Sequence, residues 1–251
     1  MTLPKLSSVN LWLLACAVSL AAAGCHAPGK PGPGPEVPRP SQVLDFPTLY
    51  RENCAACHGE NGKNGAAIAL NNPVYLAIAG TANIEKITAN GVPNTAMPPF
   101  AKSAGGMLTD QQIASLVQGM ERKWTISVEV RLVGTTGTPT PHYAATTLGD
   151  PTRGQKAFAT YCASCHGSDG SGAHLPNNLT TGSIVDPTYL ALVTDQGLRS
   201  WILAGKTEQG SHDWQSYSPD HELSDQEVTD IVAWLASHRT ATPGQVYKQH
   251  P

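Results

Sequence analysis

The sequence predicts a helical fold made of two tandem copies of one small domain. A five-residue motif occurs twice in the 251 residues, at 54–58 and at 162–166. Each copy ends in a segment, 108–117 or 223–235, in which a Thr or Ser is followed three residues later by Gln or Glu and then by apolar residues at helical spacing. This combination indicates a terminal helix opened by a capping box in each copy.

The repeated motif has the pattern Cys-x-x-Cys-His, which is the attachment signature of c-type haem. Two thiols one helical turn apart can form thioethers with the two vinyl groups of a haem, and the adjacent His then lies under the iron as its proximal ligand. The motif therefore predicts two covalently bound haem c groups. The thioether cysteines are Cys54, Cys57, Cys162 and Cys165, and the proximal ligands of the iron are His58 and His166.

Other roles for paired cysteines fit this chain less well. A redox dithiol of the thioredoxin kind needs a strand–helix–strand context, which is not visible around either motif. A zinc site needs a second pair at zinc-finger distance, and the two motifs lie too far apart in sequence for that. Structural disulfides would not require a histidine after both pairs. Haem attachment accounts for the whole motif in both copies.

The residues that flank the two motifs also match. An aromatic residue, Tyr50 or Phe158, precedes the first Cys by four positions, and a Gly-rich loop follows each His. In this plan the chain resembles class I cytochrome c domains over nearly all of residues 43–124 and 150–240. The resemblance implies an all-α fold of two tandem class I cytochrome c-like domains, each with a few short helices around one haem.

In that family the first and last helices cross at a tight contact, usually a Gly against an aromatic residue. Copy two has this pair as Gly154 and Trp234. The corresponding positions of copy one are Phe46 and Gly119, so that the large and the small residue have exchanged places. The exchange conserves the volume at the crossing, and we therefore expect Phe46 to contact Gly119.

The resemblance also implies a distal Met in a loop before the last helix. In copy one we expect this ligand to be Met97, which is followed by Pro98 and Pro99. The prolines stiffen the loop that presents the thioether. Met107, at the start of the last helix, and Met120, within it, are the alternatives, and their positions favour packing.

Copy two cannot follow this pattern, because Met120 is the last Met in the chain. Counting back from the aligned starts of the two last helices puts His212 opposite Met97, which predicts bis-His ligation of the second haem. Such a haem has a lower potential than one with His and Met ligands, because a thioether stabilises Fe(II). The competing interpretations are an open iron position and ligation by His221, His174 or His238.

The N-terminus predicts an export signal. Lys5 is the only charged residue before an apolar run at 11–23, which is too short to span a membrane and suits a signal peptide. The small residues before Cys25 resemble a bacterial lipobox, so that a lipidated Cys25 would begin the mature chain. An ordinary cleavage site and a poorer lipobox at Cys16 are the alternatives. Residues 26–42 are rich in Pro and Gly and predict a stiff, solvated spacer.

These features predict six segments along the chain. They are a lipoprotein-type signal peptide (1–24), a tether (25–42), a first haem domain (43–124), a linker (125–149), a second haem domain (150–240) and a C-terminal tail (241–251). Within the linker, residues 125–133 have partial strand-like alternation, to which no role is assigned.

Composition and ligand sets together favour an electron carrier. The formal net charge of −3 and the lack of a basic patch argue against nucleic-acid binding. We expect a cytochrome tethered to the membrane at its periplasmic face, which passes single electrons from a quinol-oxidising complex to a terminal acceptor such as a haem–copper oxidase. A di-haem redox enzyme of the peroxidase kind, with an openable second haem, is the alternative, and a haem-based sensor ranks third.

Overall fold

The computed structural model describes residues 34, 36–125, 136–206, 210–217 and 221–241. Every regular element within these residues is helical, and only two isolated β-bridges occur among them. The all-α prediction is therefore confirmed. The predicted signal peptide, Cys25 and all of the strand-like stretch except Thr125 lie outside the described residues. Two units are distinguished in the chain, Met1–Arg39 and Pro40–Pro251.

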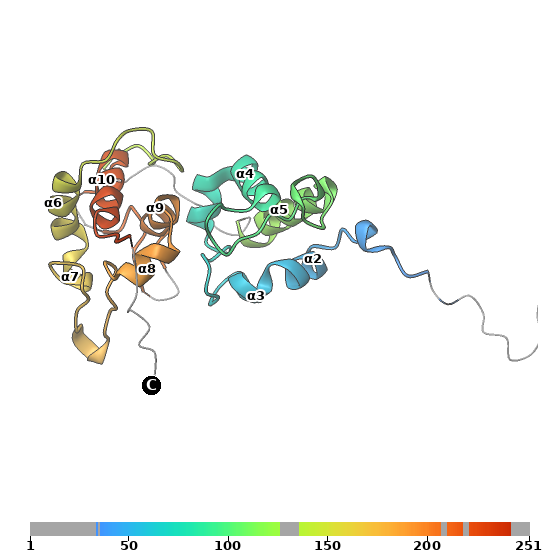
Figure 1. Cartoon of the computed structure of the whole chain (residues 1–251), viewed down its shortest axis with the longest axis horizontal. Coiled ribbons are helices and arrows are strands. Elements are labelled where there is room, and N and C mark those ends of the chain that lie inside the picture. Colours follow the sequence, from blue (N-terminus) through green and yellow to red (C-terminus); the bar gives the residue numbers. More distant parts are fainter. Residues whose placement is uncertain (1–33, 35, 126–135, 207–209, 218–220, 242–251) are drawn as a thin grey trace, which may run out of the picture. The chain divides into compact units, whose positions relative to one another are not determined.

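The α-helices of the two copies follow a similar order within the unit Pro40–Pro251, whereas the short 3-10 helices (η) stand at different places (Figure 1). The first copy contains η2 (Pro40–Gln42), α2 (Phe46–Asn53), α3 (Ala55–His58), α4 (Pro73–Asn90), η3 (Lys102–Ala104) and α5 (Asp110–Trp124). The second contains α6 (Pro151–Tyr161), α7 (Ala163–His166), η4 (Pro176–Asn178), α8 (Pro187–Leu192), α9 (Asp195–Ala204) and α10 (Asp225–Ala236). Each copy has a hydrophobic core of its own. None of the described helices is long and apolar enough to cross a membrane.

A kink divides α4 into two parts, which correspond to the two shorter helices of copy two. Gly80 has a φ of 70° and interrupts the helical backbone within α4. In copy two the corresponding stretch is divided into α8 and α9. Each stretch begins with a side-chain cap and a Pro in the first turn, since Asn72 and Asp186 accept hydrogen bonds from the backbone of the helix that follows.

The first and last helices of copy one cross where the sequence predicts. A Cβ at Gly119 of α5 would overlap the side chain of Phe46 on α2, so the two helices approach through the space that glycine leaves. Both predicted partners of the capping box are present at the start of α5, where Thr109 and Gln112 exchange hydrogen bonds. The predicted contact between Phe46 and Gly119 is confirmed.

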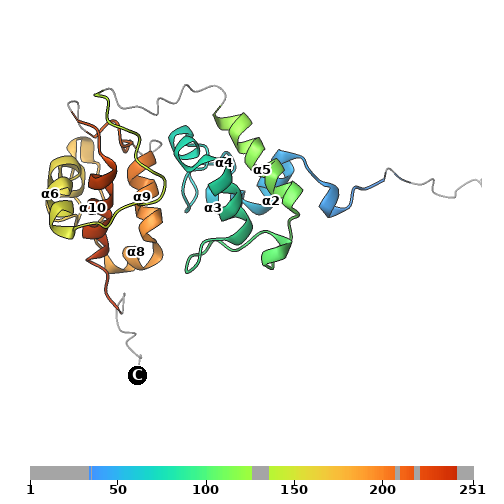
Figure 2. The same ribbon diagram turned by 90° about the horizontal axis from the view of Figure 1, so that it is seen from above.

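The crossing of copy two has the opposite arrangement. Helices α6 and α10 lie side by side in both views (Figure 1 and Figure 2). A Cβ at Gly154 would overlap the carbonyl of Asp230 and lie 2.9 Å from the Cβ of Trp234. The ring of Trp234 packs on Phe158, with 4.2 Å between ring centroids. The predicted pair of Gly154 and Trp234 is therefore confirmed as well.

A buried amide joins α4 to the end of α9. Asn72 is 4% exposed, and its Oδ1 accepts hydrogen bonds from the amides of Val74 and Tyr75 at the start of α4. Its Nδ2 donates to the carbonyl of Ala204, the last residue of α9, over 2.8 Å. One side chain thus satisfies orphan backbone groups at two helix ends.

Candidate haem sites

Both motifs form a single helical turn that follows the first helix of their copy. The amides of Cys57 and His58 donate to the carbonyl of Cys54, and Cys162 accepts the same two bonds in copy two. One thiol of each pair is buried, Cys54 at 8% exposed and Cys162 at 9%. The other two, Cys57 and Cys165, are more accessible, and all four are free of disulfides. Each site therefore offers two thiols on one turn, as thioether attachment requires.

The buried thiols have the wrong acidity for a redox dithiol. Burial, with a smaller effect from the neighbouring Cys57, raises the pKa of Cys54 to about 12. Burial and Cys165 raise the pKa of Cys162 to about 12 in the same way. Reactive dithiols depend on a lowered pKa, because the thiolate is the nucleophile. The described residues also contain no group of three or more His, Cys, Asp or Glu side chains that could hold a metal ion.

The predicted proximal histidine of the first site, His58, is held by a backbone carbonyl. Nδ1 of His58 donates to the carbonyl of Ile68 over 2.7 Å. Burial lowers the pKa of His58, and the hydrogen bond to Ile68 opposes this only in part. The imidazole is therefore neutral at physiological pH, with Nε2 available to an iron. Since the partner is a backbone atom, no residue type in the sequence indicates it.

The second proximal histidine lacks this support. Burial lowers the pKa of His166, which leaves this imidazole neutral too. Its Nδ1 is buried and has no hydrogen-bond partner among the residues that the structure describes. The two sites therefore already differ on the proximal side, where the sequence motifs are the same.

A glycine allows the chain to turn back after each histidine. Gly59 has a φ of 81° and Gly167 a φ of 78°, which is the region that side chains with a Cβ rarely adopt. A Cβ at Gly167 would also lie 2.6 Å from the carbonyl of Gly172. The Gly that follows each motif is thus required for the loop that closes the proximal side.

The predicted Met97 lies in a tight loop after α4. The amide of Val92 donates to the carbonyl of Met97 over 3.1 Å, and the amide of Met97 donates to Oγ1 of Thr95 over 3.2 Å. Met97 is half-buried, whereas Met107 is 81% exposed and Met120, at 2% exposed, belongs to the core of copy one. These placements favour Met97 among the three candidates, because its loop is fixed and its side chain is not part of that core.

The matching loop of copy two has a register that differs from the predicted one. In copy one the loop bond joins Val92, the second residue after α4, to Met97 five residues later. In copy two the bond between the same two loop positions runs the other way: the amide of Ser211 donates to the carbonyl of Lys206, the second residue after α9, over 3.1 Å. By this register Ser211 lies opposite Met97, and His212 lies one position further along.

An insertion of one residue accounts for the difference. The carbonyl of Phe100 accepts a hydrogen bond from Leu108, and the carbonyl of Trp214 accepts one from Leu223. One residue more lies between the second pair than between the first. Counting back from the last helices therefore misplaces the distal loop by one residue.

His212 lies next to an aromatic residue of the second domain. Its exposed ring is 6.2 Å from that of Tyr217, measured between centroids. Burial, together with the nearby Cys162, raises the pKa of Tyr217, and Cys165 acts in the same direction. Tyr217 packs against the hydrophobic core that contains Cys162 of the second motif, and His212 lies next to Tyr217.

Each competing histidine forms a hydrogen bond through one of its two ring nitrogens. Their ring nitrogens form hydrogen bonds from His174 to Thr180 (3.0 Å), from His221 to Glu227 (3.1 Å) and from His238 to the carbonyl of Trp234 (2.9 Å). No hydrogen bond joins the ring of His212 to a residue that the structure describes. Each of these bonds uses one ring nitrogen and leaves the other free for a ligand, so they do not exclude the three histidines.

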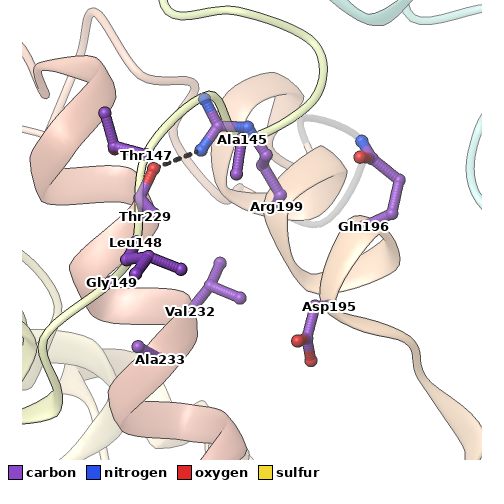
Figure 3. A pocket seen from close by; sticks show the side chains of 10 residues that line it. All are labelled: Ala145, Thr147, Leu148, Gly149, Asp195, Gln196, Arg199, Thr229, Val232 and Ala233. Atoms are coloured by element: carbon purple, nitrogen blue, oxygen red, sulfur yellow. Dashed lines mark hydrogen bonds between the residues drawn. The ribbon is translucent and has the colours of Figure 1, made fainter.

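One pocket lies away from both motifs (Figure 3). It has a volume of about 270 Å³ between residues 145–149 and helices α9 and α10. On its wall the buried Arg199 donates to Thr229 over 2.9 Å and to the carbonyl of His142 over 2.8 Å. No predicted haem ligand lines this pocket, and its arginine fastens the end of the linker to the second domain.

Each of the two copies matches a known protein family. Residues 41–118 match the family model of cytochrome c oxidase, cbb3-type, subunit III, and residues 151–239 match the family model of cytochrome c. The cbb3-type cytochrome c oxidase subunit CcoP of Azospirillum sp. (strain B510) is 26% identical over 154 residues. These residues cover 55% of this chain and 45% of that relative, so the chain spans less than half of the relative's length.

Among solved structures, a chain of the Kuenenia stuttgartiensis reducing HAO-like protein complex is similar. Its sequence identity is 18%, and the match covers 82% of this chain and 100% of that one, with a TM-score of 0.42.

Proposed function

Because the chain is a c-type cytochrome with two haem domains, we propose that it transfers single electrons between a quinol-oxidising complex and a terminal oxidase of a respiratory chain. Each bound haem supplies a reversible one-electron Fe(III)/Fe(II) couple. The CcoP relative, a subunit of a cbb3-type oxidase, supports an oxidase as the acceptor. The chain's own residues attach the haems, orient them and set their potentials.

One observation supports this proposal above all: both copies have the cysteines and the histidine that covalent attachment of a haem requires. Each copy has two thiols on one helical turn, and each of these turns ends in a His that burial keeps neutral, His58 or His166. Each motif lies against its own hydrophobic core. Two separate one-electron centres in one chain suit a relay.

The ligand sets give the relay a direction. We assign His58 and Met97 to the first haem, and His166 and His212 to the second. A thioether stabilises Fe(II), so the first haem has the higher potential and holds the electron at equilibrium. Electrons would therefore arrive at the second haem and leave from the first.

Stopped-flow kinetics with purified partners tests the function. We expect a quinol-oxidising complex with quinol to reduce the full di-haem protein, and a cbb3-type oxidase to reoxidise it within milliseconds to seconds in a cyanide-sensitive reaction. Failure of both reactions, with both haems present by pyridine haemochrome assay, would contradict the proposal.

A di-haem redox enzyme remains a second candidate, and the register of the distal loop favours it. Ser211, which lies opposite Met97, is a poor ligand for haem iron, and the ring of His212 is exposed. An iron that opens on this side would bind carbon monoxide in the reduced state and turn over peroxide. A carbon monoxide adduct on the second haem, with peroxidase activity, would favour the enzyme over the carrier.

Paired substitutions identify the distal ligand of the second haem. With His212 as the ligand, His212→Met should replace bis-His spectral features by those of Met ligation and raise the potential of the second haem. The matched variant Ser211→Met places the thioether at the position opposite Met97, and His174→Met tests one of the competing histidines. An unchanged spectrum in His212→Met, with Met ligation in Ser211→Met, would show that position 211 faces the iron and that His212 is not the ligand.

The tether is tested by removing its lipidated residue. We propose that Cys25 anchors the exported chain at the periplasmic face, so that the spacer at 26–42 separates the haem domains from the membrane. Cys25→Ala should move the haem-stained protein from the membrane fraction to the periplasmic fraction. Cys16→Ala is the control and should leave it in the membrane. Retention of Cys25→Ala in a carbonate-washed membrane would contradict the anchor.

A further inference from the structure

The core of the second haem domain contains a polar atom without a partner. Trp214 is 0% exposed, and its indole Nε1 is buried without a hydrogen-bond acceptor among the described residues. Its backbone is fully used, since the amide donates to Leu203 and the carbonyl accepts from Leu223. The indole N–H is a donor only. Its acceptor therefore belongs to none of the described side chains or backbone groups around it.

The surroundings of Trp214 indicate which acceptor this is. Trp214 belongs to the same hydrophobic core as Cys162, a thioether cysteine of the second site. A haem attached there brings two propionate carboxylates, which are its strong hydrogen-bond acceptors. A hydrogen bond from N–H to an ionised carboxylate is charge-assisted and stronger than a neutral one. A buried donor without any such partner would carry its full desolvation cost.

The first haem domain lacks this donor. Phe100 occupies the matching place, since its carbonyl accepts from Leu108 as that of Trp214 accepts from Leu223. A phenyl ring packs there without a polar atom to satisfy. The loop can therefore form without an N–H at this position, and the indole N–H is specific to the second domain.

We propose that Trp214 is a positioning residue of the second haem, whose indole N–H donates a hydrogen bond to a propionate of that haem. The bond disperses part of the carboxylate charge near the iron. Since that charge favours Fe(III), the bond raises the potential of the second haem and narrows its gap to the first. The inference rests on the haem site itself and does not depend on the proposed electron partners.

Trp214→Phe tests the proposal, because it gives the second domain the residue type of the first and keeps an aromatic ring in the core. In the holoprotein we expect a lower midpoint potential for the second haem and an unchanged one for the first, with both spectra still low-spin. The propionate carboxylate band in the redox-difference infrared spectrum should shift as the bond is lost. Trp201→Phe is the control, since Trp201 is half-exposed beneath the Lys206 ammonium, 4.3 Å from its ring, and should change neither quantity.

Wild-type protein supplies a measurement that does not depend on how the variant folds. The ultraviolet resonance Raman spectrum should contain a strongly hydrogen-bonded indole N–H that is present with haem and is retained in Trp201→Phe. An unchanged potential and an unchanged carboxylate band in a folded Trp214→Phe would overturn the proposal. So would a wild-type spectrum without a strongly hydrogen-bonded indole.

Discussion

Replacing Met97 by alanine is expected to lower the midpoint potential of the first haem by on the order of 0.1–0.2 V. Axial ligands set haem potentials over a range of roughly 0.8 V, and the thioether contributes by stabilising Fe(II). About 59 mV corresponds to a tenfold change in a one-electron equilibrium, so a fall of about 0.1 V would shift the electron toward the second haem by roughly 50-fold. A redox titration followed at the haem absorption bands measures the change.

Met107→Ala is the matched control for this experiment. Met107 is 81% exposed and should leave both potentials unchanged. The absorption band typical of Met-ligated ferric haem should vanish in Met97→Ala and persist in the control. If the band survives the loss of Met97, the ligand of the first haem is another residue and the proposed direction of the relay loses its basis.

Gly154→Ala is expected to destabilise the second domain more than its size suggests. The new Cβ would overlap the backbone carbonyl of Asp230 and lie 2.9 Å from the Cβ of Trp234. Neither atom can turn away as the end of a flexible side chain can, so α6 and α10 would have to separate. We expect a loss of about 3 kcal/mol in the free energy of unfolding, the upper end of the usual cost of overpacking. In thermal unfolding of the holoprotein, the melting temperature of the second domain should fall by roughly 10 °C or more.

Gly182→Ala is the control for the same substitution. A Cβ at Gly182 would meet no heavy atom within 4 Å, and the residue does not adopt a positive φ. This variant should unfold close to the wild type. Equal melting temperatures for Gly154→Ala and Gly182→Ala would mean that α6 and α10 are not in close contact in solution.

The ends of each domain were predictable from the sequence because they depend on local patterns. Thr109 and Ser224 cap the last helices through side chains that reach only three residues along the chain. The contacts of Gly119 and Gly154 are long-range, but the duplication supplied two versions of each crossing to compare. Each of these features occurs in both copies, so the prediction for one copy could be compared with that for the other. The structure confirms the capping boxes and both helix crossings.

The distal side was less predictable because it depends on backbone hydrogen bonds. The extra residue between Trp214 and Leu223 shifts the loop without leaving a pattern in the sequence, and it placed His212 one position away from the equivalent of Met97. The carbonyl of Ile68 that holds the first proximal histidine has no residue signature at all. The sequence does show that Trp214 stands near the place where copy one has a phenylalanine. Only the structure shows that its N–H is buried and has no hydrogen-bond partner among the described residues.

The exchange of large and small residues between the two crossings bears on how a tandem repeat avoids pairing with itself. Two similar domains on one chain can misassemble if the first helix of one packs on the last helix of the other. Here such a pairing would set Phe46 against Trp234, which is too large, or Gly154 against Gly119, which leaves a void. Only the native partners fill the space at the crossing, which favours correct pairing of the helices within each half of the chain during folding.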